Sequence, residues 1–307
     1  MAERLPDFKA RAAALHARLG AVGAARLLDG GSSWDLTGTL RRGGAIVFPH
    51  VGIDVCGHHV GAAVRACLDS GLQRVVAVGV LHALTSGLDE ARARVAAGGD
   101  PAREPAWGVQ GPGLGGRSDW EREFSLDGFV FLWSAELARR GIRGPELVLR
   151  YPFLAGGRPD LMPGIDELAS ISAGAALVAT ADSFHHGIGY GDPPGAAHPP
   201  DAAGLDAARR SIESGHALLE RGDYRAFQEQ CVRAKSDARD VGQVLRYLVG
   251  PMKARILDLV AADMSGAYRA PSPTWVAGAL VTLDPAAGRP GSSEAAATRE
   301  SGDGEGA

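Results

Sequence analysis

Three apolar runs in this chain each lead into histidine, and this pattern constrains the fold more than any other feature. The runs and the histidines that follow them are 44–49 with His50, 74–81 with His82, and 174–181 with His185 and His186. Short β-branched runs separated by helical stretches are typical of buried strands in a parallel or mixed sheet. Ligands of such sheets bind beyond the carboxyl ends of the strands. We therefore expect four of the nine histidines at one edge of one sheet.

The composition is that of an ordinary soluble globular protein, with 307 residues, 45% hydrophobic, 22% charged, and a net charge of −4. No stretch approaches the ~18–20 apolar residues of a membrane span, and the first residues lack a secretory pattern. These features predict a cytoplasmic protein with no membrane partner. The mild acidity offers no basic face for nucleic acid. Three cysteines without a CxxC pair argue against a disulfide framework and a thiolate zinc site.

The periodicity predicts one α/β domain over residues 1–284, with a central mixed, largely parallel sheet flanked by helices. We expect strands at 44–48, 74–81, 146–154, 174–181 and 275–283. We expect helices at 7–29, 57–70, 127–141, 164–172, 203–221, 223–235 and 239–263. Residues 85–118 should form an excursion over the sheet edge. Residues 187–202, with four glycines and four prolines, should form a lid or substrate-binding loop, and residues 285–307 a disordered tail.

Four short motifs occur in a fixed order between about residues 40 and 283. They are Pro49-His50-Val-Gly52 with Cys56-Gly57, then Gly79-Val-Leu-His82, Asp182-Ser-Phe-His185, and Trp275-Val-Ala-Gly-Ala-Leu280. In order and spacing this series resembles Memo-like proteins, which belong with the class III extradiol ring-cleaving dioxygenases. The resemblance implies a single α/β domain with a metal at the strand ends. It implies that His50 and His82 bind the metal and that His185 acts as acid/base beside it.

The third metal ligand is where this chain departs from the family. Memo-like proteins carry a cysteine before the long C-terminal helix, whereas residues 235–242 contain none. Asp237 is our first choice for this ligand and Asp240 our second. Alternatively, Asp237 is only a solvated charge at a helix end, with no role in metal binding. Two imidazoles and a carboxylate form the facial triad of non-haem Fe(II) oxygenases, which leaves positions for a chelating substrate and O2. A cysteine ligand would instead favour Cu(I).

Several further side chains are candidates for contacts with substrate. Asp182 could fix the tautomer of His185 or contact substrate, or simply cap the turn after its strand. Phe124 replaces the histidine of a Glu-His-Ser motif and would form an apolar wall suited to an aromatic substrate. His186 could hydrogen-bond substrate or point to solvent. Tyr190 could hydrogen-bond substrate or pack within its loop. Cys56 is predicted to line the pocket.

A competing metal site at Cys56, His58 and His59 lacks two further ligands in the sequence. The favoured function is therefore a mononuclear non-haem iron(II) dioxygenase acting with O2 on a small chelating, aromatic or heteroaromatic molecule. A non-catalytic copper-binding Memo-like protein and a metal-dependent hydrolase are the alternatives. Substrate identity, the type of oxidation and self-association stay open, although family members often form homo-oligomers.

Overall fold

The three strands that lead into histidine lie side by side at the centre of one sheet. In a computed structural model, which describes residues 7–286, they are β1 (Ala45–Phe48), β2 (Arg74–Val78) and β5 (Ala176–Thr180). β5 pairs in parallel with β1 on one side and with β2 on the other. Their carboxyl ends therefore meet at the same edge, as the sequence predicts.

The complete sheet has eight strands in the order β3-β4-β2-β5-β1-β8-β6, with β7 paired to β8. The remaining strands are β3 (Gly108–Gln110), β4 (Glu146–Phe153), β6 (Phe184–Gly187), β7 (Met252–Asp263) and β8 (Thr274–Pro285). β4 is parallel to β2, whereas β3, β6, β7 and β8 pair antiparallel. The sheet is thus mixed with a parallel centre, which confirms the predicted fold class.

One edge of β8 serves two partners in succession. Its carboxyl half pairs with β1 at 281–283, and its amino half pairs with β6 at 274–277. Between these two contacts lies Gly278, where an added Cβ would come 2.2 Å from the Cβ of Pro49 and 3.1 Å from Oδ1 of Asp182. Only glycine lets the turns after β1 and β5 approach β8 this closely.

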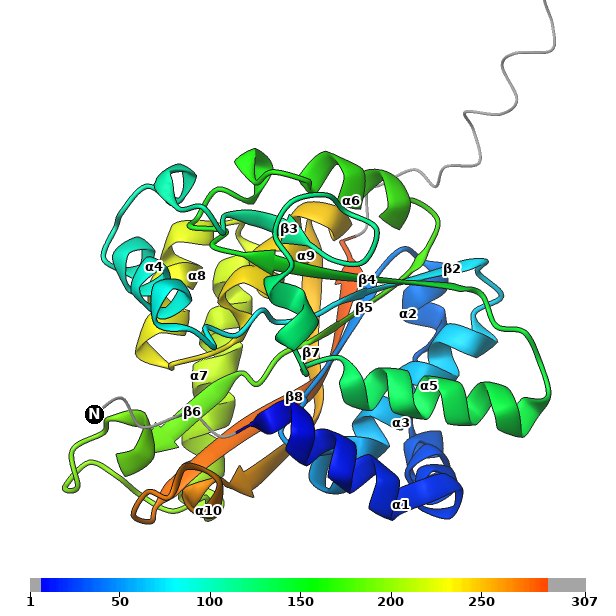
Figure 1. Cartoon of the computed structure of the whole chain (residues 1–307), viewed down its shortest axis with the longest axis horizontal. Coiled ribbons are helices and arrows are strands. Elements are labelled where there is room, and N and C mark those ends of the chain that lie inside the picture. Colours follow the sequence, from blue (N-terminus) through cyan, green and yellow to red (C-terminus); the bar gives the residue numbers. More distant parts are fainter. Residues whose placement is uncertain (1–6, 287–307) are drawn as a thin grey trace, which may run out of the picture.

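Helices cover both faces of the sheet (Figure 1). One layer comprises α1 (Phe8–Gly30), α2 (Thr37–Arg41), α3 (Ile53–Asp69) and α5 (Asp127–Arg140); the other comprises α6 (Ile165–Ser172), α7 (Ala202–Glu220), α8 (Tyr224–Arg233) and α9 (Ala238–Val249). Two short helices lie outside these layers, α4 (Ser86–Ala96) beside α8, and α10 (Ser265–Tyr268) between β7 and β8. A hydrophobic core fills the space on each face.

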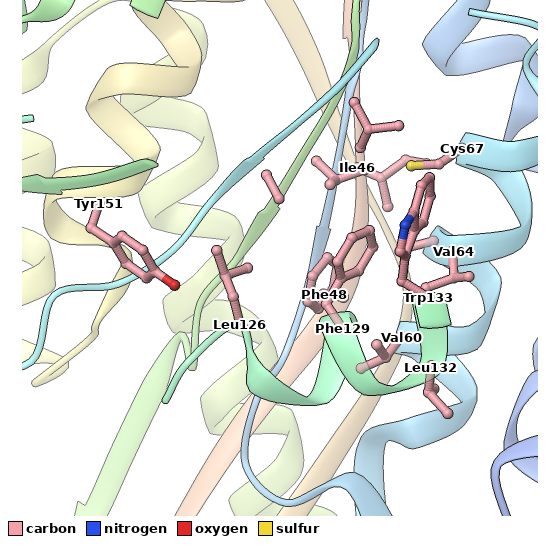
Figure 2. Close-up of a cluster of buried hydrophobic side chains, with 14 of the residues drawn as sticks. Ile46, Phe48, Val60, Val64, Cys67, Leu126, Phe129, Leu132, Trp133 and Tyr151 are labelled. Carbon is pink, nitrogen blue, oxygen red and sulfur yellow. The ribbon is translucent and has the colours of Figure 1, made fainter. Parts of the chain in front are cut away.

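The core under the first helix layer is built around aromatic rings (Figure 2). Phe48 at the end of β1 stacks on Phe129 of α5 with ring centroids 5.3 Å apart, and Trp133 stacks on Phe129 at 5.9 Å. Truncating a fully buried phenylalanine typically costs about 3–5 kcal/mol. This packing fixes the end of β1, and His50 follows two residues after Phe48.

The predicted helix 239–263 is wrong in its second half. α9 ends at Val249, Gly250 and Pro251 interrupt the chain, and β7 begins at Met252. A register shift between Ile256 and Asp258 breaks the alternation of apolar residues in β7, so its pattern imitates a helical one. The excursion 85–118 also carries regular structure, α4 and β3.

The sequence did not predict α2, β6 or α10, and the predicted loop and tail agree with the structure in part. Residues 187–202 hold one short 3-10 turn at Ile188–Tyr190 and are otherwise irregular until α7. The predicted tail overlaps β8 at Pro285, and beyond Ala286 it lies outside the described residues. Within residues 7–286 no helix combines the length and apolarity needed to cross a bilayer.

Candidate metal centre

Three donor atoms from distant segments meet at the carboxyl edge of the parallel strands. Nε2 of His50 lies 3.4 Å from Nε2 of His82 and 3.6 Å from Oδ2 of Asp237. Nε2 of His82 lies 3.4 Å from Oδ2 of Asp237. The three atoms form a nearly equilateral triangle. An ion about 2.1 Å from each atom, a bond length usual for divalent transition ions, would see angles of about 110°. The donor set and its spacing therefore fit a metal ion.

The turn between α8 and α9 delivers the carboxylate. Lys235 adopts a left-handed conformation with φ of 51°, and the backbone N–H of Asp237 donates to the carbonyl of Asp182 at 3.0 Å. Asp237 stands at the start of α9, yet its side chain caps no backbone N–H of that helix. Its carboxylate is free to face the imidazoles, and their charges outweigh burial to hold its pKa well below its usual range.

Asp240, the second choice from the sequence, serves another purpose. It is buried, and its Oδ1 accepts a hydrogen bond of 2.8 Å from the backbone N–H of Ala155. Its Oδ2 lies 3.9 Å from Arg92. Of the two carboxylates, Asp237 is the one that lies among the imidazole nitrogens.

Glu123 orients the ring of His82. Its Oε1 lies 2.9 Å from Nδ1 of His82 and its Oε2 accepts the backbone N–H of His82 at 2.6 Å. The same Oε1 also accepts the backbone N–H groups of Phe124 and Ser125. Burial raises the pKa of Glu123, but His82 and these donors prevail and lower it to about 2. An ionised Glu123 accepts Nδ1–H, so Nε2 presents its lone pair to the centre.

His50 is held in the same way, with Nδ1 3.0 Å from the hydroxyl of Thr180 and its backbone N–H donating to Asp182 at 3.0 Å.

Burial alone would lower the pKa of His82, yet Glu123 and Asp237 raise it to about 10. In the metal-free protein the carboxylates thus hold a proton on His82, which an incoming ion must displace.

The side chains of His185 and Asp182 lie beside the triangle of donor atoms. Nε2 of His185 lies 3.6 Å from Oδ2 of Asp237, and Oδ2 of Asp182 lies 3.6 Å from Nε2 of His50. Burial lowers the pKa of His185 against the opposing effect of Asp237 and Asp182, which favours the neutral ring. Its Nδ1 is buried and has no hydrogen-bond partner among the described residues. Within residues 7–286 no hydrogen bond at Nδ1 therefore fixes its tautomer.

A cavity of about 1390 Å³ opens onto this cluster. Aromatic rings succeed one another around it, each stacked on or tilted against the next with centroids 4.7–5.6 Å apart; in order they are His82, Phe124, Phe8, Tyr268, Tyr190 and His185. We call this series the aromatic collar. It joins the first turn of α1, the turn before α5, the loop after β6 and α10. The collar encloses the side of the centre that faces the cavity.

Two residues predicted to contact substrate have other partners. The thiol of Cys56 lines the cavity but donates to the carbonyl of Pro49 at 3.3 Å, and burial raises its pKa. His186 lies outside the cavity lining, with Nδ1 3.1 Å from Asp192 and Nε2 accepting the backbone N–H of His198. Because both its nitrogens are engaged, His186 fixes the loop 187–198.

Sequence reasoning missed four contributors to this region: Phe8, Glu123, Thr180 and Tyr268. Glu123 directly precedes Phe124 and belongs to the segment that matches the Glu-His-Ser motif of Memo-like proteins, so a signal was present. The hydroxyl of Thr180 and the ring of Tyr268 are recognisable only once the fold brings them to His50 and Tyr190.

Neither a scan of protein-family models nor a search of curated proteins finds a match to this chain. The resemblance to Memo-like proteins therefore rests on the motifs and stays a prediction. What the fold and the site define is a class: an α/β protein with two histidines and an aspartate placed at its strand ends so that they could hold a metal ion.

Proposed function

We propose that this protein is a mononuclear non-haem iron(II) oxygenase acting on a small chelating aromatic molecule. The triangle of His50, His82 and Asp237, open toward a cavity, is the observation that carries the proposal. Iron(II) in such a set would supply redox chemistry between a chelating substrate and O2. The three free cysteines are all buried, which suits the reducing cytoplasm expected from the sequence.

His185 is the acid/base of this proposal. Its neutral ring lies at the edge of the triangle, so Nε2 can accept a proton from a substrate hydroxyl as that oxygen approaches the centre. The same nitrogen can return the proton to a product oxygen. A positioned acid/base contributes ~10²–10⁴-fold to such reactions. Asp182 is a positioning residue, because its hydrogen bond to the backbone of His50 holds that ligand in place.

The aromatic collar accounts for the substrate class. Phe124 lies almost parallel to the ring of His82, with an interplanar angle of 12°. A flat substrate bound beside the centre would meet ring faces and edges around it, and these exclude water. The ring of Tyr190 meets the ring of His185 nearly edge-on with centroids 4.8 Å apart, so Tyr190 is the collar residue proposed to offer its hydroxyl to substrate.

A metal-dependent hydrolase is a second candidate, favoured by one feature of the geometry. Separations of 3.4–3.6 Å between donors correspond to angles near tetrahedral rather than the right angles of an octahedral face. Three ligands with a fourth position open to water define catalytic zinc sites. Copper storage has no comparable support, since no cysteine joins the donor groups within residues 7–286.

The two candidates are separated by their need for oxygen. The full chain would be purified without oxygen, loaded with Fe(II) or Zn(II), and assayed against catechols, aminophenols and ester or amide analogues. His216, on α7, belongs to neither the donor groups nor the cavity lining and serves as the control histidine. Oxygen uptake with Fe(II) that is lost in His50→Ala and His185→Ala, but kept in His216→Ala, supports the oxygenase. Product formed under nitrogen with Zn(II) supports the hydrolase. Metal binding with no turnover under either condition refutes both.

A further inference from the structure

A second group of two imidazoles and a carboxylate lies away from the cavity, between α3 and β7. Nε2 of His59 lies 3.0 Å from Oδ2 of Asp258, and Nε2 of His58 lies 3.9 Å from the same oxygen. One donor atom from each residue falls within 4.8 Å of the other two. His58 and His59 lacked a partner in the sequence because Asp258 was assigned to a helix.

The register shift in β7 sets the direction of Asp258. Ile256 pairs with Val281 and Asp258 pairs with Leu280, so the residue between them is extra. The backbone N–H of Leu259 donates to Oδ1 of Asp258 at 2.9 Å. That bond occupies one carboxylate oxygen and leaves Oδ2 directed at the two imidazoles.

Trp34 forms a wall of the same group. Its ring stacks on His58 with centroids 5.8 Å apart and meets the ring of His59 edge-on at 5.4 Å. His59 is fully buried, whereas the side chains of His58 and Asp258 are 31% and 43% exposed. The group is thus anchored on its inner side and open to solvent on its outer side.

We propose that His58, His59 and Asp258 form a second binding site for a divalent transition ion such as Zn²⁺, Co²⁺ or Ni²⁺, with water completing the coordination. Imidazole and carboxylate suit this class of ion, and bonds of about 2.1 Å require donor separations of about 3.0–3.4 Å. His59 and Asp258 already meet this requirement. His58, partly exposed on the solvent side, has the freedom to close the remaining gap to Oδ2.

The surroundings predict how the two sites rank in affinity. Nδ1 of His82 faces the carboxylate of Glu123 and Nδ1 of His50 faces the hydroxyl of Thr180. Nδ1 of His59 is buried without a hydrogen-bond partner among the described residues. Partners at this second nitrogen are typically worth 10–100-fold in metal affinity. The site at Asp258 should therefore bind about 10–100-fold more weakly than the centre at Asp237.

The experiment is a titration of the metal-free full chain with Co²⁺, followed by visible absorption and by metal content after gel filtration. Two equivalents should bind to the wild type in two phases. His58→Ala and Asp258→Asn should each lose the weaker phase and keep the tighter one, whereas His50→Ala should do the opposite. His216→Ala is the matched control and should keep both phases.

Three outcomes overturn the proposal: one equivalent in the wild type, two phases that both survive in His58→Ala and Asp258→Asn, or two phases that both vanish in His50→Ala. His58 is partly exposed and Asp258→Asn is nearly isosteric, so both variants should fold, which circular dichroism checks. The readout is metal binding alone. Failure of the second site therefore leaves the proposed oxygenase untouched, and a centre without turnover leaves the second site untouched.

Discussion

Replacing Glu123 with glutamine tests the link between buried charge and metal affinity. The carboxylate is 1% exposed and accepts four hydrogen bonds, from Nδ1–H of His82 and from the backbone N–H groups of His82, Phe124 and Ser125. Glutamine is nearly isosteric but replaces one accepting oxygen with an NH2 donor. In either orientation the NH2 group faces at least one N–H donor, so a buried hydrogen bond is lost.

Two effects follow from Glu123→Gln. Metal affinity at the first centre should fall about 10–100-fold, which equals about 1.4–2.8 kcal/mol, because His82 loses the acceptor that orients it and raises its basicity. The metal-free protein should also lose stability, since each buried donor left without an acceptor costs about 1–3 kcal/mol.

The assay is competition for Zn²⁺ against a chelator of known affinity, combined with urea unfolding of the metal-free form. Glu136→Gln is the matched control, because Glu136 is equally buried but pairs with Arg139 and Arg140 on α5, away from the metal centre. It should lower stability and leave metal affinity at the first centre unchanged. If Glu123→Gln binds metal within twofold of the wild type, our assignment of Glu123 is refuted.

Three further predictions concern the same centre. The raised pKa of His82 means that its protonated ring stabilises the metal-free fold below about pH 6.5, and this contribution is lost as pH rises through about 10. An ion must displace that proton, so metal affinity should rise about tenfold per pH unit between about pH 7 and 10. Calorimetry would measure the proton release, and an affinity that does not change with pH would contradict the prediction. Gly278→Ala should destabilise the protein by about 1–3 kcal/mol in urea, because its Cβ would clash with Pro49 and crowd Asp182, and an unchanged midpoint would argue against that contact. His185→Gln should keep its metal content but lower turnover ~10²–10⁴-fold, so a parallel loss of metal would make His185 a ligand instead.

The central strands and their histidines are predictable because their signal is local. A short β-branched run between helices identifies a buried parallel strand, and parallel neighbours must end at a common edge. That rule alone brings His50 and His82 near one another, whereas His185 lies on β6, a short strand that pairs antiparallel with β8 and that the sequence did not predict. Their order along the chain, 50, 82 and 185, carries no information about the distances among them.

The remaining ligand was left open between two aspartates because the choice depends on one turn. The left-handed conformation of Lys235 directs Asp237 into the site, while Asp240, one helical turn later, faces the backbone of Ala155. No propensity scale distinguishes two aspartates at the start of the same helix. The segment of β7 was predicted as helix for a related reason, because its extra residue near Asp258 hides the alternation of apolar residues that marks a strand.

The pairing of Ala45 with Leu283 has a consequence for how the protein is made. The first strand to leave the ribosome meets this neighbour only after nearly the whole domain has been synthesised, and closing so long a loop is slow. The turns that hold Pro49 and Asp182 against Gly278 form at that same late moment. We therefore expect the surroundings of His50 to be completed late, so that metal uptake would report the completion of folding.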